Sequence, residues 1–105
     1  MLKAKISALL LVLAALTVVA QAPAQAYSCT IDSWSQVGVT TLKVHTQPSN
    51  TSTTVGTVAK GSNYHYCSSS GRNAGGYWWV YGYGYHGTTK LTGWVIGQTP
   101  YLAHP

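Results

Sequence analysis

The sequence predicts an all-β fold, a small barrel of about five to seven short antiparallel strands. Short segments of alternating or β-branched residues recur about every ten residues, and Gly, Pro, Ser and Asn turns separate them. No window has the apolar periodicity of an amphipathic helix. Repeated short strands with turns between them are typical of small barrels and sandwiches.

The first 26 residues have the features of a cleaved signal peptide. Lys3 and Lys5 precede an apolar run, residues 6–20, which is shorter than the roughly 20 residues of a membrane-spanning helix. Ala24-Gln25-Ala26 has the small-x-small form of a signal-peptidase site. We therefore predict cleavage after Ala26 and secretion, with the product free or associated with the cell wall. The alternatives are an uncleaved anchor and acylation of Cys29, which no lipobox Leu precedes.

The remaining 79 of the 105 residues suffice for one small domain, 37–105, after an N-terminal leader, 27–36. Residues 27–105 contain one negative side chain, Asp32, and four positive ones, which gives a net charge of +3. The positive residues are Lys43, Lys60, Arg72 and Lys90. Because these positive residues are scattered and form no basic stripe, we expect no nucleic-acid partner.

Cys29 and Cys67 both lie after the predicted cleavage site. An exported chain meets oxidising conditions, so we predict a disulfide between them, which closes a loop of about 39 residues. The alternative, a zinc site, needs three or four ligands, and the four histidines have no ligand spacing. We expect no metal and no cofactor.

Five main strands are expected, over residues 37–45, 53–59, 63–68, 77–85 and 91–96. The stretch 68–76 is expected to be a loop, because it is rich in Ser, Gly and Asn. Tyr101-Leu102 is expected to add a final short pairing or a single helical turn.

The strand over 77–85 has an unusual division of residues between its faces. One face carries aromatic rings alone, and the other is smaller, with Trp78, Val80, Gly82 and Gly84. The smaller face fits a narrow interior, so we predict that the aromatic face lines an exposed groove. A bulge or a one-residue register slip would exchange the two faces. In the alternative interpretation some of these rings are core, above all Trp79 and Trp94.

The order of motifs resembles that of bacterial SH3 (SH3b) domains. The motifs that carry the resemblance are Leu42-Lys43-Val44-His45, Pro48, residues 55–61 (VGTVAKG), Trp78-Trp79-Val80, Gly93-Trp94-Val95 and Tyr101-Leu102. The resemblance covers residues 37–102 and implies an SH3-like barrel without enzymatic activity, of a kind that binds cell-wall peptides. Lys43 and His45 stand where the family has Asn and Arg, the two cysteines are additions, and the strand after Trp79 is richer in Tyr and Gly. The resemblance therefore implies the fold more directly than the ligand.

The residue inventory favours binding over catalysis. Asp32 is the only carboxylate side chain, which excludes paired-carboxylate chemistry, and no Gly-x-Ser-x-Gly nucleophile motif is present. Four Trp, eight Tyr and no Phe favour surfaces that are partly apolar and partly wet. We therefore predict a binding surface that comprises Tyr77, Trp79, Tyr81, Tyr83, Tyr85 and Trp94.

The expected protein is a monomeric, non-catalytic binding domain whose partner is a cell-wall peptide, peptidoglycan or another extracellular ligand. His45 and His86 are candidates for pH dependence. Two other functions fit the same features: a secreted inhibitor or effector that binds an extracellular protein, and a self-associating structural protein of the cell surface.

Overall fold

The computed structural model describes residues 27–105, and the predicted signal peptide, residues 1–26, lies outside them. Seven antiparallel strands form one sheet, and a short 3₁₀ helix, η1 (Ser68–Ser70), precedes the fifth strand. The strands are β1 (Ser33–Gln36), β2 (Thr41–His45), β3 (Thr54–Ala59), β4 (Asn63–Tyr66), β5 (Arg72–Ala74), β6 (Tyr77–His86) and β7 (Thr89–Ile96). Within the described part of the chain, no helix has the length and apolar character needed to cross a membrane.

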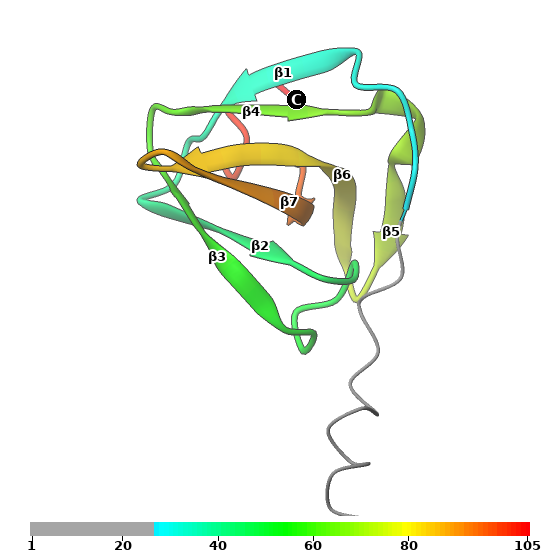
Figure 1. The fold of residues 1–105 in the computed structure, drawn as a ribbon. Helices are drawn as coiled ribbons and strands as arrows, with labels where there is room; N and C mark the ends of the chain where they lie inside the picture. Colours follow the sequence, from blue (N-terminus) through cyan, green and yellow to red (C-terminus); the bar gives the residue numbers. More distant parts are fainter. Residues whose placement is uncertain (1–26) are drawn as a thin grey trace, which may run out of the picture.

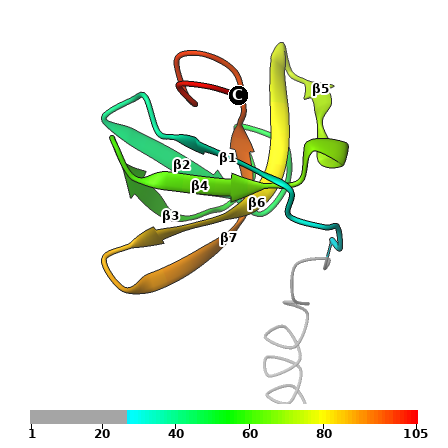
Figure 2. The same ribbon diagram turned by 90° about the horizontal axis from the view of Figure 1, so that it is seen from above.

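The long hairpin β6–β7 is the centre of the sheet, whose order is β1-β4-β6-β7-β2-β3. Strand β6 bends, so that its first part lies beside β5 and its second part lies between β4 and β7 (Figures 1 and 2). The C-terminal segment lies next to β1, where Val37 and Leu102 form an isolated bridge. The bridge confirms the short pairing expected at Tyr101-Leu102.

The main core lies on one side of the β6–β7 hairpin. It is one cluster of buried side chains from β2, β3, β4, β6 and β7 together with the two ends of the domain: Val37, Leu42, Val44, Val58, Tyr64, Tyr66, Val80, Leu91, Val95 and Leu102. The hydroxyl of Tyr64 donates a hydrogen bond of 2.7 Å to the Gly93 carbonyl, which satisfies its polar end inside the core. Burial raises the pKa of Tyr64 well above its ordinary value of 10.0.

The glycines of β6 are the positions where the core leaves no room for a side chain. A Cβ at Gly82 would overlap the backbone of His65 and Tyr66, and one at Gly84 would press on the Tyr64 ring and on Val58. The smaller face of β6 therefore points inward at Val80, Gly82 and Gly84, as predicted. Trp78 is different: it is 40% exposed and lies outside the main core. The prediction that Trp78 faces the interior is wrong, because the bend of β6 carries its first residues past the end of the core.

Several predicted elements differ from the observed ones, among them the last predicted strand, since β7 begins at Thr89 and not at residue 91. Strand β2 begins at Thr41 and not at residue 37, because Val37 donates to the Ser62 carbonyl and pairs with Leu102. Strand β4 ends at Tyr66 and not at residue 68. The expected loop 68–76 contains η1 and the short strand β5. The expected leader 27–36 contains β1, which pairs with β4.

The predicted disulfide is present, between Cys29 and Cys67. It joins the segment before β1 to the residue that follows β4. Next to it Asp32 accepts hydrogen bonds from the Ser68 backbone N–H at 2.7 Å and from the Ser68 hydroxyl at 2.6 Å. The Ser68 hydroxyl, followed by the Ser68 N–H, holds the pKa of Asp32 below its ordinary value of 3.8.

We expect removal of the disulfide to lower the stability of residues 27–105 substantially. Closing a loop with a sequence separation of 38 contributes about 4 kcal/mol in the chain-entropy model. The double variant Cys29→Ser/Cys67→Ser avoids a free thiol, and urea unfolding followed by tryptophan fluorescence measures the change. A loss below about 1 kcal/mol would contradict a main stabilising role for the disulfide.

We expect Asp32 to make the domain acid-sensitive. Because the pKa is lower in the folded state than in the unfolded chain, the hydrogen-bonded carboxylate stabilises the fold above pH 3.8, and this contribution disappears as the pH falls through the folded-state pKa. In Asp32→Asn this part of the acid dependence should be absent. Urea midpoints at about pH 5 and about pH 2.5 measure it, and Ser69→Ala, also exposed and next to Ser68, is the control. Equal acid sensitivity of wild type and Asp32→Asn would refute this role.

Candidate ligand-binding site

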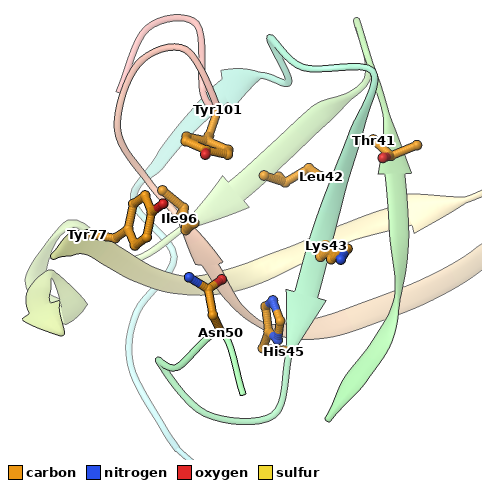
Figure 3. Close-up of a pocket in the computed structure, with 8 residues that line it drawn as sticks. All are labelled: Thr41, Leu42, Lys43, His45, Asn50, Tyr77, Ile96 and Tyr101. Carbon is orange, nitrogen blue, oxygen red and sulfur yellow. The ribbon is translucent and has the colours of Figure 1, made fainter. Parts of the chain in front are cut away.

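A pocket of about 210 Å³ opens between the edge of the main core, at Leu42, and the outer face of the sheet, which is the face of β6 and β7 opposite that core. Strand β2, the loop after it, the start of β6, the end of β7 and the C-terminal segment contribute its walls (Figure 3). Its lining residues are Thr41, Leu42, Lys43, His45, Asn50, Tyr77, Ile96 and Tyr101. The pocket therefore joins residues that are distant in the sequence.

Strand β2 brings His45 to the pocket by the ordinary alternation of its side chains. Val44 packs in the main core, and His45, on the opposite face, pairs with Trp94 and lies against Trp79. The register with β3 shifts between Val44 and His45. The His45 side chain is only 4% exposed, and its ring lies edge-on to Trp79 at a centroid distance of 5.5 Å. His45 is thus a buried polar group at the edge of a cavity.

The hydrogen bonding of His45 determines which nitrogen is free. Nδ1 lies 3.3 Å from the Ser52 carbonyl oxygen, and because that oxygen only accepts, Nδ1 carries a proton. Nε2 has no hydrogen-bond partner within residues 27–105. In Figure 3 the ring nitrogen farther from the backbone points into the space between Asn50 and Lys43. A buried nitrogen without a partner therefore faces the pocket.

The opposite wall of the pocket is aromatic. The rings of Tyr77 and Tyr101 are perpendicular, with centroids 6.1 Å apart, and both residues are half-buried. A hydrogen bond of 2.9 Å from the Gly38 N–H to the Tyr101 carbonyl and the bridge at Leu102 hold the C-terminal segment in place. Ile96 adds an apolar surface beside these rings.

The charge of the pocket is positive. Lys43 contributes an ammonium group, and no carboxylate side chain lines the pocket. Asp32, the one carboxylate side chain in the sequence, is held by Ser68 next to the disulfide. Among residues 27–105, no group of three His, Cys, Asp or Glu side chains is placed to hold a metal ion.

The six residues of the predicted binding surface are distributed over the outer face, and only Tyr77 lines the pocket. Trp79 is fully buried, and its Nε1 donates to the Ala74 carbonyl at 2.8 Å. Trp94 is also buried, 3% exposed. Together with Ile96 they form a second buried cluster, the aromatic cluster. Trp79 and Trp94 are therefore core residues, as in the alternative interpretation, and neither of them lines the pocket.

The N-terminal segment covers part of this aromatic cluster. The Tyr27 ring lies 5.0 Å from the Trp94 ring and 4.9 Å from the Tyr81 ring, measured between centroids. The Arg72 guanidinium lies over Trp94, at 4.6 Å from the ring centroid. Tyr81, which is half-buried, is thereby joined to Tyr27 and Trp94 in one packed group.

Tyr83 and Tyr85 lie at the other end of β6. The Tyr83 ring is stacked on His65, with centroids 5.0 Å apart, and Lys90 Nζ lies 4.3 Å from the centroid of Tyr83. Tyr85 is 45% exposed. The predicted row of five aromatic rings does share one face, but its members differ in burial: Tyr77 lines the pocket, Trp79 is buried, Tyr81 and Tyr83 are half-buried, and Tyr85 is exposed.

Apart from Tyr77, none of the residues that line the pocket belongs to the binding surface predicted from the sequence. Lys43 and His45 carried a sequence signal only through the resemblance to SH3b domains, in which Asn and Arg are usual at these two positions. Asn50 carried none, because only the course of the loop after β2 brings it to the pocket.

Comparisons with models of protein families, with curated proteins and with solved structures return no match.

Proposed function

We propose that this protein is a secreted, non-catalytic binding domain that recognises a cell-wall peptide at the outer-face pocket. The observation that carries the proposal is the composition of the pocket: aromatic rings, an apolar floor, Lys43 and His45, without a carboxylate side chain. Apolar walls with a few polar groups are typical of ligand sites in proteins.

Binding is favoured over catalysis because the pocket lacks a matched set of reactive groups. His45 is bonded through Nδ1 to a backbone carbonyl and not to a carboxylate that would orient it as a general base. The Asp32 carboxylate accepts hydrogen bonds from Ser68 and does not line the pocket. The lining residues offer hydrogen-bond donors, acceptors and ring faces, which suit a peptide.

The proposed architecture is the SH3-like barrel that the motifs imply. The shared core supports this architecture. Strands β3 and β4 lie on opposite sides of the β6–β7 hairpin in the order of the sheet, yet side chains of both belong to one buried cluster, as in a sheet that curls around its core. The bend of β6 also supports it, since strands must bend for a small sheet to curl. The disulfide supports export, because such bonds persist in oxidising compartments.

Sedimentation with purified, insoluble peptidoglycan tests the proposed function. We expect residues 27–105 to sediment with peptidoglycan, and Tyr77→Ala to lower the affinity roughly tenfold, which corresponds to about 1.4 kcal/mol for an aromatic contact residue. The measurement is the bound fraction over a series of protein concentrations.

Tyr85→Ala is the matched control, because it removes the same side chain from the same strand outside the pocket. Thermal unfolding of both variants separates a loss of binding from a loss of folding. Absence of wild-type sedimentation would refute the recognition of the cell wall. Equal loss of affinity in the two variants would refute the pocket as the site.

A further inference from the structure

We propose that the pocket binds the free C-terminal carboxylate of an extended peptide, through Lys43 Nζ and His45 Nε2. This inference rests on the proposed function in one respect, namely that the pocket is a peptide site, and it adds the chemical group that is recognised.

The size of the pocket limits what it accommodates. Its volume, about 210 Å³, is below the roughly 300–1,000 Å³ of pockets for drug-sized ligands. The terminal one or two residues of a peptide suit this volume better than an internal segment, which would have to enter and leave. Ile96 is an apolar neighbour for a small terminal side chain, and the half-buried Tyr77 and Tyr101 rings flank it (Figure 3).

The charges at the pocket favour an anion. Lys43 is exposed, and the one carboxylate side chain of the chain, Asp32, is bonded to Ser68. The ammonium of Lys43 is therefore not neutralised by a side chain of the described residues. A ligand carboxylate next to it gains a charge-assisted hydrogen bond.

The buried His45 supplies the second group. A buried polar atom without a hydrogen-bond partner is rare in folded proteins and calls for an explanation. Nε2 of His45 is such an atom, and it adjoins the pocket. Because Nδ1–H is committed to the Ser52 carbonyl, Nε2 donates to a carboxylate only when the imidazole is protonated. Ligand binding therefore takes up a proton at His45.

The other side chains at the pocket determine which of its groups are charged. Besides His45, the side chains with polar groups that line the pocket are Thr41, Lys43, Asn50, Tyr77 and Tyr101, and Trp79 lies against the His45 ring. Lys43 is the only charged one among them near neutral pH, and Tyr and Lys ordinarily titrate near pH 10. Of these side-chain types, only an imidazole ordinarily gains or loses a proton between about pH 5 and pH 8.

A matched pair of peptides tests the inference. The probes are N-acetyl-Ala-Ala-Ala with a free carboxylate and the same peptide with a C-terminal amide, and NMR titration of residues 27–105 measures both affinities. We expect the free acid to shift the signals of His45 and Tyr101 and to bind more tightly as the pH falls from about 8 to about 5.5, where the ligand carboxyl is still ionised. We expect the amide to bind roughly tenfold more weakly or not at all.

Two variants assign the contacts. Lys43→Gln should weaken binding of the free acid roughly two- to fivefold, as for an exposed ion pair, while Lys90→Gln, the same change outside the pocket, should have no effect. His45→Asn keeps a donor near the Ser52 carbonyl, removes Nε2, and should abolish the pH dependence. Heteronuclear spectra verify that each variant is folded.

Equal affinity for the acid and the amide, no binding of either up to about 10 mM, or signal shifts confined to the far end of β6 would each overturn the inference. These outcomes can be distinguished from a failure of the proposed function. Sedimentation with peptidoglycan without a preference for the free acid leaves wall binding intact and removes the carboxylate contact. Binding of the free acid without sedimentation supports the carboxylate contact and refutes the recognition of the cell wall.

Discussion

The absence of side-chain volume on the inner face of β6 is the constraint on which the rest of the structure depends. At Gly82 a side chain would overlap the β4 backbone, and at Gly84 it would meet the Tyr64 ring. These two positions let β4 and the Tyr64 ring approach the hairpin closely, and the Tyr64 hydroxyl reaches the Gly93 carbonyl. Since side chains alternate along a strand, the bulky side chains of β6 between Val80 and His86 then lie on the outer face.

That asymmetry gives this small domain two apolar regions in place of one. The main core is mostly aliphatic and lies inside, and the aromatic cluster of Trp79, Trp94 and Ile96 lies outside. An outer cluster needs cover, which the chain provides from its two ends: Tyr27, anchored close to the disulfide, packs on Trp94, and Tyr101 packs on Tyr77. The disulfide therefore helps to cover the aromatic cluster as well as to shorten the unfolded chain.

The pocket lies where this cover is incomplete. Tyr101 and Tyr77 close one side of it, and the end of β2 forms the other. Because Val44 points into the main core, the alternation of β2 places the His45 side chain in this gap, on the same face as the exposed Lys43. The polar groups of the pocket thus come from one strand and its aromatic wall from two other parts of the chain, so the site depends on the packing of the C-terminal segment against the start of β6.

The strand periodicities, the turn residues, the cysteine pair and the division of β6 into a small and an aromatic face are all local patterns. For this reason the sequence by itself determined the antiparallel all-β fold, the disulfide and the inward direction of Val80, Gly82 and Gly84. It did not determine β1 and β5, because short polar strands such as Ser33–Gln36 acquire their structure from their partners. Only the tertiary structure decided which rings are buried and that His45, Asn50, Tyr77 and Tyr101 share a pocket. Burial and proximity depend on how segments far apart in the chain cover one another, and no local pattern contains that information.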